Sequence, residues 1–188
     1  MGEIMSGEIN ELQRRKLARR FALIDVDGDG KLEEEDYAQI APRVAAVFGQ
    51  SLDSPHAVAL REGYLKLWAG LLRKMDADGD GMITEDEFVA SIAGSIIGRE
   101  GFDRHILPLA EAFVGLADVD GSGELDVVEF ARLFGALGVG GGDAAQAFKR
   151  LDRDGSGRLT VDEIIAAIRD FYTSPDPEAP GNALFGAF

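Results

Sequence analysis

Four short segments of the chain place aspartate or glutamate at alternate positions around a glycine. They read DVDGDGKLEEED, DADGDGMITEDE, DVDGSGELDVVE and DRDGSGRLTVDE, and they span 25–36, 76–87, 118–129 and 152–163. Calcium is a hard cation that takes six to eight oxygen ligands at about 2.3–2.6 Å, and alternate loop residues can supply those oxygens. The internal repeat therefore predicts four calcium-binding loops.

The positions of each loop have separate roles. Side chains at positions 1, 3, 5 and 12 supply oxygens, position 7 supplies its backbone carbonyl, and glycine at position 6 takes a sharp bend. The predicted ligands are Asp25, Asp27, Asp29, Lys31 and Asp36; Asp76, Asp78, Asp80, Met82 and Glu87; Asp118, Asp120, Ser122, Glu124 and Glu129; and Asp152, Asp154, Ser156, Arg158 and Glu163. The aliphatic residues at position 8 are expected to join two loops by a short β-bridge inside the core: Leu32, Ile83, Leu125 and Leu159.

The four predicted sites are not equal. The first loop ends in Asp36 where the others end in glutamate. A shorter side chain reaches less easily for bidentate coordination, which should move this site toward magnesium or toward weaker calcium binding. The fourth loop has the fewest acids and carries two cations, Arg153 and Arg158, so it is expected to be weaker than the second and third loops.

Helical patterns flank every loop. Apolar residues 1, 4 and 8 positions before a loop predict one buried face of an entering helix. These residues are Ile24, Phe21 and Leu17; Met75, Leu72 and Trp68; Ala117, Val114 and Ala110; and Leu151, Phe148 and Ala144. Exiting helices are expected to begin directly after position 12, at Tyr37, Phe88, Phe130 and Ile164. The prediction is an all-α fold of four helix–loop–helix units, arranged in two pairs.

The uneven spacing of the loops suggests the domain organisation. The predicted parts are an N-terminal extension at 1–11, a first pair at 12–98, a second pair at 102–172 and a docking C-terminal tail at 173–188. A boundary near Gly98–Gly101 separates the pairs, and 138–143 (GVGGGD) is expected to form a turn inside the second pair.

Two segments outside the loops have recognisable signals. In the long first interval, a lengthened exit helix should stop near Gly49, and a new helix should start at Ser54 with Pro55 in its first turn. The tail has three prolines, so it cannot be a long helix, but Leu184, Phe185 and Phe188 can dock on the body.

Composition limits the function classes. The 34 acidic and 19 basic residues give a formal net charge of −15, which repels nucleic acid and anionic membranes and favours cations. The chain has no cysteine, which is consistent with a cytoplasmic protein. Phosphate-binding loops, nucleophile elbows and zinc-spaced ligands are not found, so we expect no enzyme. We expect a monomer, with an unidentified protein partner left open.

The sequence is compatible with more than one role for calcium binding. A sensor opens a groove, often rich in methionine, whereas this chain has four methionines, two of them at Met1 and Met5. This favours a calcium buffer or signal modulator over a sensor that exposes a surface to a partner. The N-terminal MGEIMS also fits the N-myristoylation pattern, but Glu3 fits poorly beside the modified glycine and no membrane association is predicted.

The loops place the chain, by resemblance, in the EF-hand superfamily. The long first interval, the first loop ending in Asp36 and the RDFYTSPDPEAPGNALFG segment at 169–186 resemble the sarcoplasmic calcium-binding protein group, and within it the calerythrin-like proteins of actinomycetes. This resemblance implies a compact body with both pairs packed together and the tail over it. It also implies that Asp36 is compatible with binding. Members often have a degenerate second hand, but 76–87 is intact here, which suggests four sites. Luciferin-binding proteins and photoproteins share this architecture and are a further alternative.

Overall fold

The computed structural model describes the backbone of residues 10–95, 99–140 and 144–188, and the side chains of these residues except 93–105. The elements are α1 (Glu11–Ile24), β1 (Lys31–Leu32), α2 (Glu34–Ala38), α3 (Ile40–Phe48), α4 (Pro55–Met75), β2 (Ile83–Thr84), α5 (Glu85–Ser95), α6 (Arg99–Ala117), α7 (Val127–Ala136), α8 (Ala144–Leu151), α9 (Val161–Thr173) and the 3₁₀ helix η1 (Pro180–Ala183). The N-terminal hexapeptide MGEIMS lies outside the described residues, as do 96–98 and 141–143 of the predicted boundary and turn.

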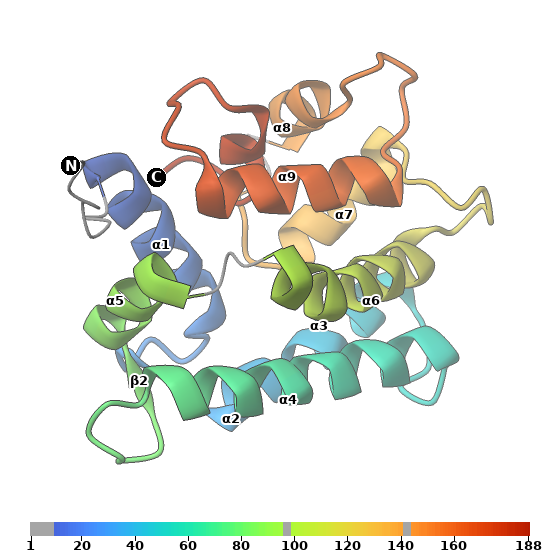
Figure 1. Cartoon of the computed structure of the whole chain (residues 1–188). Coiled ribbons are helices and arrows are strands. Elements are labelled where there is room, and N and C mark those ends of the chain that lie inside the picture. Colours follow the sequence, from blue (N-terminus) through green and yellow to red (C-terminus); the bar gives the residue numbers. More distant parts are fainter. Residues whose placement is uncertain (1–9, 96–98, 141–143) are drawn as a thin grey trace.

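The helices enclose one hydrophobic core. Figure 1 shows α4 along one side of the molecule with α3 and α6 next to it, while α7, α8 and α9 form the opposite half. Buried residues from all these helices, and from α1, α5 and the C-terminal residues, form a single cluster. The predicted all-α fold is confirmed, since the only strands among the described residues are two of two residues each. No helix of the described part is both long and apolar enough to cross a bilayer.

The entering helices bury the faces that their periodicity predicted. In α1, Leu17, Phe21 and Ile24 are buried, and the equivalent residues before the other loops are buried or, for Leu72, partly buried. The first of these helices begins with a capping box, in which the Asn10 side chain accepts a hydrogen bond from the backbone N–H of Gln13 at 2.8 Å. Apolar spacing and a local cap therefore fix both the orientation and the start of the helix.

The exiting helices begin earlier than predicted. They start at position 10 of their loops, with Glu34, Glu85, Val127 and Val161, and not after position 12. In the first, third and fourth loops position 9 is the N-cap and the acid at position 12 completes a capping box, so this acid already belongs to the first helical turn. Our prediction of the helix starts was wrong because it treated the acids as ligands alone.

The first exit helix is also shorter than predicted. It breaks at Gln39 into α2 and α3, and Pro42 explains the break. Proline has no N–H to donate to the carbonyl of Ala38, but it is tolerated in the first turn of a new helix. The predicted stop at Gly49 is confirmed, since this residue caps α3 with a left-handed φ of 65°.

The next helix starts as its sequence predicted. Ser54 is the N-cap of α4 and its hydroxyl accepts from the N–H of Ala57 at 3.3 Å, with Pro55 at the first helical position. The break between α3 and α4 is therefore encoded by residues that lie close together in the sequence.

The C-terminal segment, residues 174–188, is held by cations of α1. Lys16 is only 1% exposed, and its ammonium donates to the carbonyl of Ser174 at 2.9 Å and to the side chain of Asn182 at 3.0 Å. Arg19 donates to the carbonyl of Phe185 at 3.2 Å. Burial lowers the pKa of Lys16, while the nearby Asp170 opposes that shift. The two ends of the described chain therefore meet through buried polar contacts (Figure 1).

Replacing Lys16 with methionine is expected to destabilise the fold. The change keeps most of the buried aliphatic stem but leaves the acceptors on Ser174 and Asn182 without a donor, which costs about 2 kcal/mol. Urea denaturation monitored by circular dichroism would measure this loss. Arg14→Met, at an exposed position of the same helix, is the matched control and should change stability by less than about 0.5 kcal/mol. Equal stabilities of the two variants would contradict the anchoring role.

Candidate metal centres

The loops are joined in pairs through position 8. Strands β1 and β2 are antiparallel, with Leu32 opposite Ile83. In the other pair, Leu125 and Leu159 exchange backbone hydrogen bonds of 2.9 and 2.8 Å. All four of these side chains have 0% exposure. The predicted β-bridges are confirmed, and each ties the ligand oxygens of two loops to one buried contact.

The first aspartate of each loop organises the backbone around it. One of its carboxylate oxygens accepts a hydrogen bond from the N–H of the glycine at position 6, at 2.8 to 3.1 Å. These four glycines have φ between 78° and 86°, a left-handed conformation that side chains with a Cβ rarely adopt. They are Gly30, Gly81, Gly123 and Gly157. The residue at position 3 similarly accepts from the N–H of position 5, so the loop is folded around inward-facing oxygens.

The acid at position 12 links the two ends of each loop. Its two carboxylate oxygens accept hydrogen bonds from the N–H groups of positions 2 and 9, at 2.7 to 3.2 Å. The donors are Val26 and Glu33 for Asp36, Ala77 and Thr84 for Glu87, Val119 and Asp126 for Glu129, and Arg153 and Thr160 for Glu163. The shorter Asp36 makes both contacts, so the first loop closes in the same way as the others.

Three carboxylates of every loop come close enough to share one ion, with oxygens within 4.8 Å of one another. The groups are Asp25, Asp27 and Asp36; Asp76, Asp78 and Asp80; Asp118, Asp120 and Glu129; and Asp152, Asp154 and Glu163. Asp29 and Glu87 lie outside these groups. All four clusters consist of oxygen donors alone, which is the donor set of calcium or magnesium.

In the third and fourth loops, the predicted ligands at positions 5 and 7 lie next to each other. The hydroxyl of Ser122 donates to the carbonyl of Glu124 at 3.0 Å, and the hydroxyl of Ser156 donates to the carbonyl of Arg158 at 3.0 Å. Positions 5 and 7 thus present adjacent oxygens, as coordination by a single ion requires. The assignment of each residue as a ligand stays a prediction.

Local hydrogen bonding and burial shift the pKa of some loop carboxylates. The N–H of Thr84 holds the pKa of the Glu87 carboxyl below its ordinary value, and Ser122 does the same for Asp120. Burial has the opposite effect on Asp36 and raises its pKa, which its backbone donors only partly offset. Burial and backbone donors therefore shift the pKa of these loop carboxylates in opposite directions.

Arg158 of the fourth loop reaches into the third. Its guanidinium donates to the hydroxyl of Ser122 at 2.8 Å and forms an ion pair of 3.3 Å with Asp120. Both of these residues are predicted ligands of the third loop, so a metal ion there must compete with an intramolecular cation. In the first pair the equivalent side chain, Lys31, contacts the sulfur of Met82 at 3.5 Å. Sequence spacing identifies position 7 as a backbone ligand but gives no information on where its side chain points.

Asp36→Glu is expected to increase the calcium affinity of the first loop by roughly tenfold relative to magnesium, because the longer side chain can supply two oxygens. Proton–nitrogen NMR titration can follow this loop by itself through the amide of Gly30, which donates to Asp25. The amide of Gly81 serves as the internal control for an unchanged loop. An unaltered ratio of calcium to magnesium affinity at Gly30 would contradict the effect of side-chain length.

Arg158→Ala is expected to strengthen calcium binding at the third loop by about two- to fivefold, the range of an exposed ion pair, because it removes the competing cation. The amide of Gly123 reports on this loop. Arg153→Ala is the matched control, since it removes the same charge from the fourth loop but pairs with Asp170. Equal effects of the two substitutions on Gly123 would show that net charge, and not the contact with Asp120, sets the affinity.

The loops and helices match known families. Residues 14–93 match the model of an EF-hand domain pair, and residues 143–172 match that of an EF-hand domain. Calerythrin from Saccharopolyspora erythraea is 31% identical over 159 residues, which cover 84% of this chain and 90% of calerythrin. The luciferin-binding protein of Renilla reniformis is 25% identical and covers 92% of both chains.

Solved structures agree with these matches. A calcium-binding protein of Streptomyces coelicolor superposes with a TM-score of 0.74 at 36% identity and covers 87% of this chain and 99% of its own. A sarcoplasmic calcium-binding protein from amphioxus shares the fold, with a TM-score of 0.76 at 19% identity over 96% of this chain and all of its own. The chain belongs to the calerythrin-like EF-hand calcium-binding proteins.

Proposed function

We propose that this protein is a cytoplasmic, monomeric calcium buffer or signal modulator without catalytic activity, which uses the predicted ligands of all four loops. The main support is that the apolar faces of the two EF-hand pairs are buried against each other. Tyr64 of α4 and Phe113 of α6 pack edge to face with centroids 5.8 Å apart, and they join the first pair to the second. A sensor needs such faces free to take a partner helix.

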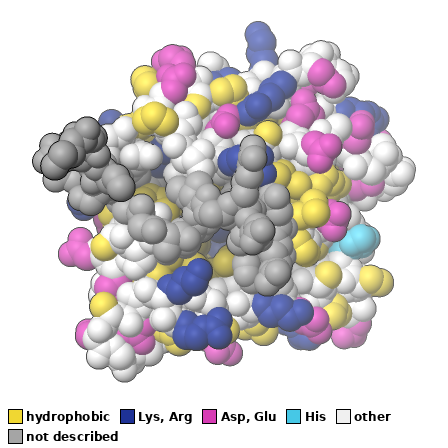
Figure 2. All heavy atoms as spheres, in the orientation of Figure 1, with side chains coloured by type: hydrophobic (Ala, Val, Ile, Leu, Met, Phe, Trp, Pro, Cys, Tyr) yellow, Lys and Arg dark blue, Asp and Glu magenta, His cyan; other side chains and the backbone are white. Residues whose placement is uncertain are grey.

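The charge distribution supports coupling between calcium and stability. Three carboxylate oxygens within 4.8 Å repel one another in each loop. Figure 2 shows acidic side chains mostly around the edge of the face in view. Because a bound cation relieves this repulsion, binding should order the loops together with the helices that they join.

A sensor is the second candidate, and one relative favours it. The protein of Streptomyces coelicolor serves prokaryotic calcium-mediated regulation. A regulatory protein of this type has to change the surface that it offers to a partner when calcium binds. The distinction between buffer and sensor therefore depends on whether calcium exposes or buries apolar surface.

The size of the internal cavity argues against a luciferin-binding role. The Renilla relatives bind luciferin or coelenterazine. The cavity between α1, α4, α6, α7 and α9 has a volume of about 110 Å³, whereas an engineered cavity of about 150 Å³ holds benzene. A ligand with several aromatic rings would require extensive expansion of this core. Addition of coelenterazine should therefore leave its absorption spectrum unchanged.

Calcium is expected to raise the melting temperature by more than about 20 °C. At a calcium concentration 100-fold above Kd, each site adds about 2.7 kcal/mol. Four sites would add about 11 kcal/mol, and each kcal/mol corresponds to about 2–4 °C for a chain of this length. Thermal unfolding followed by circular dichroism, in excess calcium and in chelator, measures the shift.

The dye ANS separates the two candidate roles in the same samples. A buffer should bind less ANS with calcium than without it, because its apolar faces stay buried while its loops become ordered. A sensor should bind more ANS in calcium. A chain with Glu87, Glu129 and Glu163 each replaced by glutamine is the control, since it should lose most of the calcium response. A calcium-dependent increase in ANS fluorescence in the unmodified chain would overturn the buffer proposal.

A further inference from the structure

Arg20 is a buried cation without a carboxylate partner among the described residues. Its side chain is 8% exposed, and its Nε has no hydrogen-bond partner there. The guanidinium lies 4.6 Å from the ring centroid of Phe185 and interacts with the hydroxyls of Tyr64 and Tyr172. These neighbours satisfy part of its hydrogen-bonding capacity but carry no negative charge at neutral pH. An unpaired buried charge is uncommon in protein cores, where ionised groups are usually paired.

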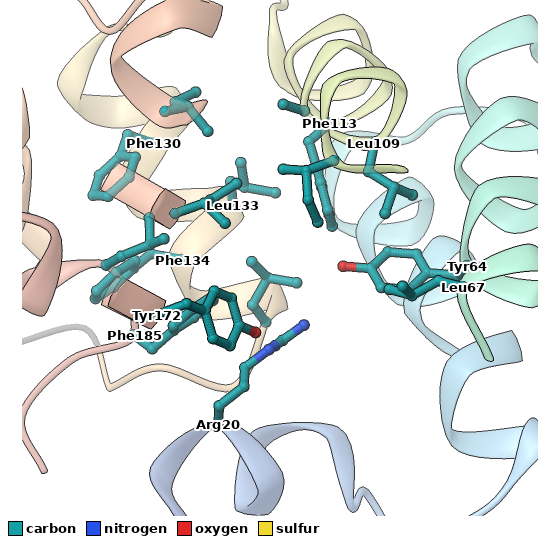
Figure 3. Close-up of a pocket in the computed structure, with 16 residues that line it drawn as sticks. Arg20, Tyr64, Leu67, Leu109, Phe113, Phe130, Leu133, Phe134, Tyr172 and Phe185 are labelled. Carbon is teal, nitrogen blue, oxygen red and sulfur yellow. The ribbon is translucent and has the colours of Figure 1, made fainter. Parts of the chain in front are cut away.

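This cation faces the internal cavity. Figure 3 shows the guanidinium of Arg20 pointing between Tyr172 and Tyr64, whose hydroxyl is directed toward the middle of the space. Apart from Arg20 and the two tyrosine hydroxyls, the described side chains that line the cavity are apolar, and Phe113 and Phe134 form opposite walls. The cavity therefore has one positively charged end, with two hydroxyl groups near it, and an otherwise apolar surface.

Arginine keeps its charge in this setting. Burial by itself lowers the pKa of Arg20 and the neighbouring Tyr172, Tyr64 and Tyr37 oppose that shift, but the guanidinium stays protonated at neutral pH in either case, because its ordinary pKa is above 12. The guanidinium presents a planar fork that matches the two oxygens of a carboxylate. A strongly hydrated anion such as phosphate would lose its water shell against apolar walls, whereas an apolar carboxylate would bury its body there.

We propose that this cavity binds a small apolar monocarboxylate. Its carboxylate pairs with Arg20 and accepts hydrogen bonds from the hydroxyls of Tyr64 and Tyr172, and its hydrocarbon body packs against Phe113 and Phe134. The volume of about 110 Å³ is about three quarters of that of a cavity that holds the six carbon atoms of benzene, so the hydrocarbon body of the best ligand has about four carbon atoms, in addition to the carboxylate carbon at Arg20. Pentanoate and its branched isomer have this size and chemistry.

The C-terminal segment provides a route of entry. Leu184 and Phe185 line the cavity, and the backbone of Phe185 is attached to α1 by the hydrogen bond from Arg19. This wall is made of short irregular chain, which opens more readily than a packed helix. A ligand can therefore reach Arg20 without separation of the EF-hand pairs.

Pentanoate labelled with ¹³C at the carboxyl carbon is the probe, added to the full chain in excess calcium. NMR should show binding with Kd on the order of 0.1–1 mM and nuclear Overhauser effects between the ligand methyl group and the rings of Phe113 and Phe134. Pentan-1-ol, of similar length but neutral, should bind at least about tenfold more weakly because it cannot pair with the guanidinium. Acetate and octanoate test the predicted size and should both bind more weakly than pentanoate.

Two substitutions test the charge of Arg20 and the volume of the cavity separately. Arg20→Gln should remove the preference for pentanoate over pentan-1-ol. Ala110→Leu keeps Arg20 but adds three carbons at a residue that lines the cavity, so it should abolish binding of both compounds. Arg14→Gln removes the same charge from an exposed position of α1 and should leave both affinities unchanged. A variant that still binds calcium in a titration is folded, so calcium titration identifies the variants that can be compared.

Several outcomes would overturn the proposal. They are the absence of contacts between pentanoate and the two rings, equal affinity for pentanoate and pentan-1-ol, or binding to Ala110→Leu as tight as to the unmodified chain. If Arg20→Gln does not fold, the Ala110→Leu variant and the comparison of charged and neutral ligands still test whether the cavity binds a carboxylate. The calcium response is measured separately, so a failure here leaves the proposed calcium function untouched.

Discussion

The carboxylate at position 12 is the constraint on which the rest of the structure depends. It accepts hydrogen bonds from both ends of its own loop, and it also lies in the first turn of the exiting helix. Each entering helix is thereby fixed to its exiting helix through one side chain. When a metal ion binds this carboxylate in place of its backbone donors, the angle between the entering and the exiting helix must change. Binding chemistry and helix packing therefore involve the same atoms.

The position-8 bridges extend this constraint from one loop to the next. Because Leu32 and Ile83 are fully buried and Leu125 and Leu159 are too, the loops of a pair cannot shift independently without opening the core. Arg158 adds an electrostatic connection, since its loop shares a cation with the ligands of its neighbour. The two loops of the second pair should thus influence each other through packing and through charge. In the first pair, Lys31 contacts a thioether, and packing dominates.

Local signals in the sequence were sufficient for much of the fold. The loops, the bridges between them and the caps at Gly49 and Ser54 depend on residues that are close in sequence or on a repeat, and these predictions were correct. The helix starts were misplaced because the capping role of the position-12 acids was not considered. The division into domains and the individual ligands remain predictions.

The basic segment of α1 shows why the remaining features could not be predicted. RRKLARR, at 14–20, has the composition of a solvated helix face, and Lys16 and Arg20 alternate with residues of the apolar stripe. Their burial depends on carbonyls and rings near residues 170–188, more than 150 positions away in the sequence. Periodicity indicates which face of a helix is apolar but not which cations at its border will be covered by a distant segment. A polar attachment of this kind places positive charge in the core of a chain with net charge −15, next to an apolar cavity. The fold therefore keeps cation binding at its surface loops separate from an interior that is suited to an anion.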